Sequence, residues 1–182
     1  MAMRKLSHIN NKGQVQMVDV TAKAPTSRRA KARSIVKMDC QTLKLIEKGQ
    51  IAKGNVLGIA KIAGIMAAKK TGEIIPLCHP LELTAIEVKL EIDRKNSRII
   101  IESEVKNVGK TGVEMEALTA VSIAALTVYD MCKAADKKIT IEEIMLLEKS
   151  GGKSGAFLRK TPIPKAKSIG IGKLNNPAKR RV

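Results

Sequence analysis

The sequence predicts an α+β fold in which helices cover one face of an antiparallel sheet. Apolar residues alternate with charged ones from 83 to 93, and a second alternating segment at 98–108 follows a four-residue turn. A period of two is typical of half-buried strands, so these segments form an antiparallel hairpin with one wet side. Apolar residues recur at helical spacing at 55–70 and 113–135, which predicts two helices.

The elements before the hairpin are shorter. Residues 1–34 are polar and irregular and are expected to form an extended arm. A short strand at 35–36 and a short helix at 42–48 follow. In the helix at 55–70, Asn55 is the expected N-cap, and two internal glycines permit close approach of another backbone. The glycines are Gly58 and Gly64.

The helix at 113–135 carries few charges and is expected to be buried nearly all round. The segment 141–149 fits either a helix or a strand. As a strand it completes the order βαββαβ, the ferredoxin-like split motif. The chain then divides into an N-terminal arm (1–34), a ferredoxin-like domain (35–156) and a basic tail (157–182) that is expected to be disordered.

The net charge of +17 lies mainly at the two ends of the chain. Residues 1–37 hold nine lysines and arginines against one aspartate, and residues 159–182 hold eight and no acid. The centre is nearly neutral, and the chain has one Tyr, one Phe and no Trp. Binders of single-stranded nucleic acid usually add stacking aromatics. Nucleic-acid binding is therefore not expected as the main function, and a nucleotide- or RNA-binding module is the alternative.

Cysteine spacing and hydropathy indicate a reduced, cytoplasmic protein. The three cysteines lie far apart without a CxxC pair, so neither a disulfide framework nor a zinc site is expected. No apolar segment typical of a signal peptide follows the N-terminus. The longest apolar run without charge, 117–129, is too short to span a bilayer.

Two places combine residue types suited to catalysis. His79, one of only two histidines, precedes a proline that favours an extended backbone; the simpler alternative is a loop histidine bonded to backbone. Asp130 and Lys133 are spaced to pair on one helix face, and a surface ion pair is the alternative. Because Asp130 ends a long uncharged run, we expect a desolvated carboxylate suited to proton transfer.

The start of the same helix carries two more acids. Glu114 and Glu116 suit the helix dipole, and residues two apart do not share a helix face. Glu116 and Asp130 are fourteen residues apart, about 21 Å along a continuous helix. A single site that used both would therefore have to be shared between subunits.

A glycine-rich segment follows at 151–155. It is not a Walker A loop, because Leu147 occupies the position of the first glycine. Either a loop that closes over phosphates or a plain linker fits this segment.

Six segments, in order and in register over about 6–156, resemble the cyclic pyranopterin monophosphate synthase family (molybdenum-cofactor biosynthesis protein C). They are Val18-Asp-Val-Thr-Ala-Lys-Ala24, Lys53-Gly-Asn-Val-Leu-Gly58, Ile75-Pro-Leu-Cys-His-Pro-Leu81, Thr111-Gly-Val-Glu-Met-Glu-Ala-Leu-Thr-Ala120, Tyr129-Asp-Met-Cys-Lys133 and Lys149-Ser-Gly-Gly-Lys-Ser-Gly155. The basic tail lies outside the resemblance.

The resemblance implies a lyase of molybdenum-cofactor biosynthesis with its catalytic domain at 35–156. It implies conversion of 3′,8-cyclo-7,8-dihydro-GTP to cyclic pyranopterin monophosphate with release of pyrophosphate. No metal or organic cofactor, membrane or nucleic acid is implied. The implied assembly is a homohexamer, a trimer of dimers with active sites at the dimer interface.

The resemblance also implies roles for ten residues. Asp130 matches the catalytic aspartate, and Lys53 and Lys133 match lysines implicated in catalysis. The matches to substrate-binding residues are Leu77, Cys78, His79, Met115, Glu116, Glu114 and Arg28. Cations suit a triphosphate substrate, and pterin formation needs proton transfers near neutral pH. Our hypothesis makes Asp130 with Lys133 the acid/base pair, while His79 and the two glutamates orient purine and ribose.

Overall fold

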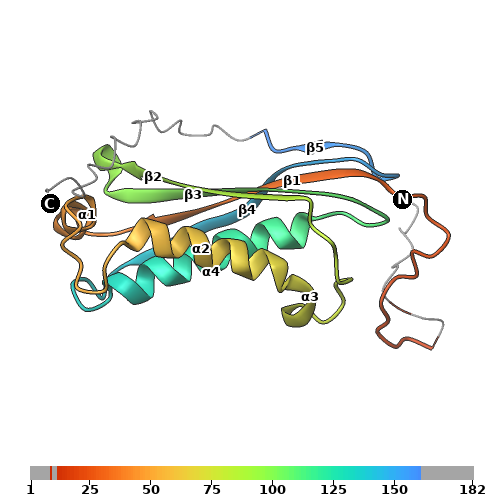
Figure 1. Ribbon diagram of the computed structural model, residues 1–182, viewed down its shortest axis with the longest axis horizontal. Coiled ribbons are helices and arrows are strands. Elements are labelled where there is room, and N and C mark those ends of the chain that lie inside the picture. The colour runs from red at the N-terminus through yellow and green to blue at the C-terminus, as the bar shows by residue number, and fades with distance from the viewer. Residues whose placement is uncertain (1–8, 10–11, 161–182) are drawn as a thin grey trace, which may run out of the picture.

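The computed structural model describes residue 9 and residues 12–160 of the chain (Figure 1). Its elements follow in chain order: β1 (Thr26–Lys37), α1 (Cys40–Glu47), α2 (Val56–Lys69), α3 (Thr71–Ile74), β2 (Ala85–Asp93), a 3₁₀ turn (Arg94–Asn96), β3 (Arg98–Gly109), α4 (Glu114–Cys132), β4 (Thr140–Ser150) and β5 (Phe157–Leu158).

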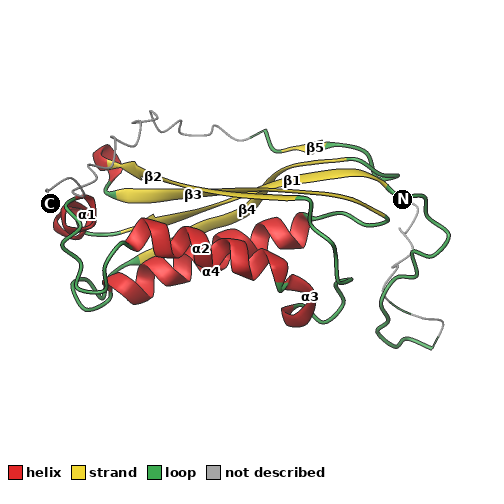
Figure 2. Ribbon diagram, in the orientation of Figure 1, coloured by secondary structure: helices red, strands yellow, loops and turns green. Residues whose placement is uncertain are grey.

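The molecule has two layers, a five-stranded antiparallel sheet and a pair of helices on one of its faces (Figure 2). The strand order is β2-β3-β1-β4-β5. Without α1, α3 and β5, the order along the chain is β1, α2, β2, β3, α4, β4. The predicted ferredoxin-like βαββαβ topology is therefore confirmed, and the ambiguous segment at 141–149 is a strand.

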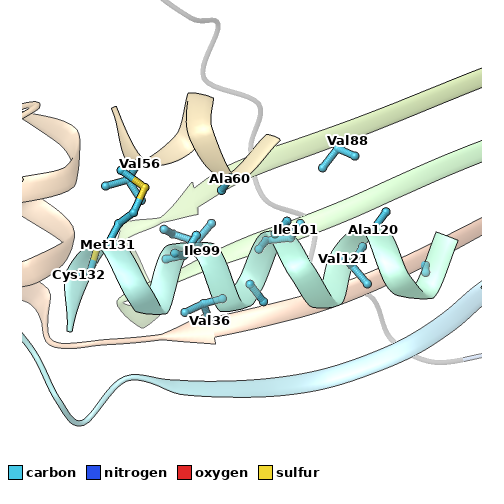
Figure 3. Close-up of a cluster of buried hydrophobic side chains, with 14 of the residues drawn as sticks. Val36, Val56, Ala60, Val88, Ile99, Ile101, Ala120, Val121, Met131 and Cys132 are labelled. Carbon is cyan, nitrogen blue, oxygen red and sulfur yellow. The ribbon is translucent and has the colours of Figure 1, made fainter. Parts of the chain in front are cut away.

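The core lies between the helices and the sheet (Figure 3). Alternate residues of β3 point into it, and Ile99, Ile101 and Val105 are fully buried. Val121 of α4 and Ala60 of α2 meet them from the helix layer. The predicted inward face of the returning strand is confirmed.

Strand β1 is longer than expected, since it begins well inside the segment assigned to the arm. Its inward residues here are Ala30 and Ala32, which are fully buried yet too small to give a strong apolar signal. Its outward residues are cations: Arg29 and Lys31 both pair with Glu104 of β3, at 2.9 and 3.2 Å. A sheet with small residues inside and ion pairs outside looks irregular in the sequence.

The expected tail also contributes to the sheet. Phe157–Leu158 forms β5 and pairs antiparallel with Glu148 and Lys149 of β4. This pairing covers part of an otherwise open sheet edge. Residues 161–182 of the expected tail lie outside the described residues, and the division into arm, domain and tail stays a prediction.

Helices α2 and α4 pack closely because Gly64 lacks a side chain. A Cβ there would lie 2.9 Å from the Ala120 carbonyl oxygen, so the predicted close approach is confirmed at this glycine. Gly58 instead faces the side chain of Asn55, which caps α2 by accepting from the Gly58 N–H at 2.9 Å. The predicted N-cap is confirmed.

Helix α4 is less enclosed than expected. By length and composition it could cross a membrane, but 56% of that window is buried within this fold, so it is the core helix of a packed domain. Leu126 is nevertheless 53% exposed. Three apolar residues of α2 are also exposed on the helix layer: Ile59, Ile62 and Met66. These four residues are called the apolar helix face below.

Candidate active site

The first cluster lies where α4 ends and the loop before α2 meets it. Lys53 donates from Nζ to Asp130 Oδ2 at 2.6 Å and to the Asp130 carbonyl at 3.0 Å. Lys133 Nζ lies 2.7 Å from the other carboxylate oxygen, as the i,i+3 spacing predicted. These three residues form the lysine–aspartate cluster. One carboxylate thereby holds two ammonium groups in place.

The expectation of a desolvated Asp130 is wrong for the isolated chain. Its side chain is 53% exposed, since α4 turns this residue away from the core. Hydrogen bonds from Lys133 and, to a lesser extent, from Lys53 lower the pKa of Asp130 to about 2. The hydrogen bond between Lys133 and Asp130 also raises the pKa of Lys133. Asp130 is therefore ionised at neutral pH and acts here as an acceptor that positions two cations.

The second cluster lies around the first turn of α4 and consists of Arg28, Leu77, Cys78, His79, Glu114, Met115 and Glu116. Glu116 points inward and is 3% exposed, and burial raises the pKa of this carboxyl to about 7, with the charge of Glu114 adding to the rise. Burial also raises the pKa of Cys78, to which the charge of Glu116 contributes. Of these two carboxyl groups, Glu116 is therefore the one whose pKa lies near neutral pH. Leu77 and Met115 are half-buried nearby in the chain.

Glu114 turns outward from the same helical turn, as two-residue spacing requires. It lies 3.3 Å from Lys149 Nζ of β4, and this lysine also donates to Ser154 Oγ at 2.6 Å. Gly112 leaves room for the carboxylate, because a Cβ at this position would collide with it. Lys149 therefore links the N-terminal turn of α4, through Glu114, to the glycine-rich segment, through Ser154.

Arg28 is 9% exposed and donates to the carbonyls of Gly109 and Lys110, at 3.4 and 3.3 Å. Gly151 and Gly152 pack against it with φ of 92° and 75°. A Cβ at Gly152 would overlap the guanidinium. In this structure the glycine-rich segment covers Arg28.

His79 contacts the N-terminal arm. Its Nε2 lies 2.9 Å from the Val18 carbonyl oxygen, so the simpler reading of a loop histidine bonded to backbone is met in this structure. Two residues where the arm meets the fold escaped sequence reasoning: Lys110, which donates to the Thr21 carbonyl at 2.7 Å, and Asp19 of the arm itself. Asp19 lies within one of the six segments that resemble the family, and Lys110 directly precedes another. Their position in the sequence could therefore have marked them as candidates.

One chain does not bring all candidate residues together. Asp130 joins Lys53 and Lys133 at one end of α4, and the remaining seven residues lie around its other end. The helix is continuous, so about 21 Å separates Glu116 from Asp130. Among the described residues, no group of three or more His, Cys, Asp or Glu side chains could hold a metal ion.

The fold and these two charged clusters define an α+β enzyme domain whose polar groups gather at the two ends of one core helix. The chain belongs to the MoaC family, whose sequence model matches residues 17–152.

Three similar proteins share one enzyme name. Proteins named cyclic pyranopterin monophosphate synthase are 55% identical in Heliobacterium modesticaldum (86% of this chain, 99% of the relative), 57% in Desulfitobacterium hafniense (85% and 94%) and 58% in Listeria monocytogenes (84% and 94%). The chain is thus a member of an enzyme family of molybdenum-cofactor biosynthesis.

Proposed function

We propose that the chain is a cyclic pyranopterin monophosphate synthase, a lyase that converts 3′,8-cyclo-7,8-dihydro-GTP to the cyclic monophosphate and releases pyrophosphate in the cytoplasm. The lysine–aspartate cluster supports the proposal most directly. Two ammonium groups held 2.6 and 2.7 Å from one carboxylate are placed to bind phosphate oxygens and to neutralise charge as pyrophosphate leaves.

The structure suggests a division of labour different from the sequence-based hypothesis. Asp130 orients Lys53 and Lys133, and their ammonium groups donate hydrogen bonds to the substrate. Glu116, whose pKa is raised to about 7, takes and returns protons during ring rearrangement. Arg28, His79 and the other residues of the second cluster bind and orient the substrate.

A complete site would combine the two clusters from different subunits. Ile123 lies halfway between Glu116 and Asp130, so a two-fold axis near it would place Asp130 of one protomer beside Glu116 of the other. The apolar helix face supports this arrangement, because Ile62 and Leu126 would be buried by such packing. We propose a homodimer built on this face and, from the family resemblance, a hexamer of three dimers.

Turnover of the purified protein tests the function. With 3′,8-cyclo-7,8-dihydro-GTP we expect pyrophosphate and the cyclic pterin, and no product from Asp130→Ala, whose exposed side chain the fold does not need. Glu87→Ala removes a carboxylate that is 55% exposed on the sheet and should keep activity. Absence of product from a folded, oligomeric wild type would contradict the proposal and favour the nucleotide- or RNA-binding alternative.

Mixing two inactive variants tests the shared site. Asp130→Ala and Glu116→Gln should each be inactive alone, while subunit exchange produces heterodimers with one intact site of two. Random exchange should restore about a quarter of the wild-type activity. No recovery, with exchange verified by a mass-tagged subunit, would show that both ends do not act in one site.

A further inference from the structure

The N-terminal arm is held at two points, one on His79 of the second cluster and one on Lys110 beside it. The Val18 carbonyl oxygen lies 2.9 Å from His79 Nε2, and the Thr21 carbonyl accepts from Lys110 Nζ at 2.7 Å. Between them the Thr21 N–H donates to Asp19 Oδ1 at 2.8 Å. These five residues form the arm clasp.

The clasp determines which nitrogen of His79 carries the proton. A carbonyl oxygen can only accept a hydrogen bond, so Nε2 must be the donor. A neutral imidazole has one N–H, and its other nitrogen then presents a lone pair. With Val18 in place, Nδ1 of His79 is an acceptor.

Electrostatics tie the same groups together. The hydrogen bonds from Thr21 lower the pKa of Asp19, and the positive charge of Lys110 lowers it further. A proton on His79 would act on Asp19 in the same direction. Asp19 therefore lies within electrostatic reach of both anchors. Lys110 comes from the loop before α4, so the arm has a fixed point on the enzyme body that is independent of His79.

We propose that Lys110 is a positioning residue that, by holding the arm, keeps the Val18 carbonyl on His79 Nε2 and leaves Nδ1 to accept a hydrogen bond from an N–H or O–H group of the substrate. The proposal rests on the proposed function for the identity of the substrate, but the state of the ring in the free enzyme does not depend on it. Without the clasp both neutral forms of the ring become accessible, and a ring in the Nδ1–H form offers the substrate a donor in place of an acceptor.

Nitrogen-15 NMR of the histidines tests the ring state directly. The chain has only two histidines, His8 and His79, and a His8→Gln variant assigns the remaining signals. At alkaline pH, where the ring is neutral, the substrate-free wild type should show the Nε2–H form. Lys110→Met should shift His79 toward a mixture of forms, and Lys110→Arg, which keeps a cationic donor, should restore the wild-type signature.

Asp19→Ala gives a second variant at an exposed position, where no effect on the core is expected, and it should shift the signature in the same direction. A wild type without the Nε2–H form, or an unchanged form in both Lys110→Met and Asp19→Ala, would overturn the proposal.

Kinetics complete the test. Loss of one substrate hydrogen bond should raise the KM of Lys110→Met about tenfold with a smaller effect on kcat. Lys137→Met, an exposed lysine in the turn before β4, should leave both constants unchanged. An altered ring signature with wild-type kinetics would overturn the positioning role. No turnover by a wild type that shows the Nε2–H form would contradict the proposed function, and with it the role given to His79.

Discussion

Two carboxyl groups of α4 differ in environment although they lie on the same helix. Glu116 faces the core and its pKa is raised to about 7, whereas Asp130 faces two lysines and its pKa is lowered to about 2. The sequence places both residues in the site but assigns the desolvated environment to Asp130. Burial depends on which side of the helix meets the sheet, and a helix with apolar residues on most sides does not reveal it.

Glu116 should make the stability of the protein depend on pH. Its pKa is higher in the folded than in the unfolded chain, so stability is greatest below the unfolded pKa and falls as pH rises from about 4.5 to about 7. Glu116→Gln should remove this dependence and raise the free energy of unfolding at pH 8 by on the order of 3 kcal/mol.

Urea unfolding at pH 5 and pH 8, at one protein concentration, measures this effect. The two proteins should differ at pH 8 and converge toward pH 5. Equal slopes of stability against pH in both proteins would show that Glu116 keeps an ordinary pKa.

The glycine-rich segment allows a matched pair of substitutions. Gly152 and Gly155 both have positive φ, 75° and 69°, but a Cβ would overlap Arg28 at Gly152 and meet nothing within 4 Å at Gly155. Gly155→Ala should cost only backbone strain, about 1 kcal/mol. Gly152→Ala should cost about 2 kcal/mol more, or displace Arg28 and raise KM. Thermal melting and steady-state kinetics of the two variants measure these effects. Equal changes in stability and in KM for the two variants would show that the contact between Gly152 and Arg28 does not matter.

At the scale of elements, the contact between α2 and α4 depends on one missing methyl group. Gly64→Ala gains about 1 kcal/mol of helix propensity but pushes a Cβ to 2.9 Å from the Ala120 carbonyl oxygen. Overpacking of this kind costs about 1–3 kcal/mol, so we expect a net loss of about 1 kcal/mol. Differential scanning calorimetry would measure it, and a higher melting temperature would show that the helices separate without cost.

Helices and strands with a regular spacing of apolar residues were predictable from the sequence, and those with an irregular spacing were not. The hairpin and both long helices agree with the sequence within a few residues because burial of their inward faces imposes the period. Strand β1 was shortened in the prediction because alanines fill its inner face. In α2, Ile59 and Met66 follow helical spacing yet are exposed, while Ala60 and Gly64 pack against α4. Apolar spacing alone cannot tell which of two apolar faces is internal.

At the scale of the whole molecule, the apolar helix face is exposed to solvent in the single chain. Leu126→Arg should therefore dissociate the proposed dimer, since a charge cannot be buried there without a partner. We expect a folded protein smaller than the wild type in analytical ultracentrifugation, no larger than the trimer that the other contacts of the proposed hexamer could hold, with no turnover. Leu158→Arg, on β5 and 70% exposed, should leave the dimer intact. A fully active monomer would contradict the shared site.

Segment resemblance names ten candidate site residues, and their roles stay predictions. It does not reveal how these residues are arranged in space. The ion pairs of Asp130, the link from Lys149 to Glu114 and the arm clasp join residues far apart in the chain. Such contacts depend on the packed fold, and residue spacing does not encode them.

The two clusters lie at the two ends of one continuous core helix, so in the proposed shared site the length of α4 would affect catalysis. Deleting a single residue from its middle would turn one end by about 100° relative to the other and shorten the separation by about 1.5 Å. In a two-fold dimer that error would occur at both active sites at once. The number of residues between Glu116 and Asp130 thus fixes both the distance and the rotation between them. No side-chain change elsewhere could restore their relative positions.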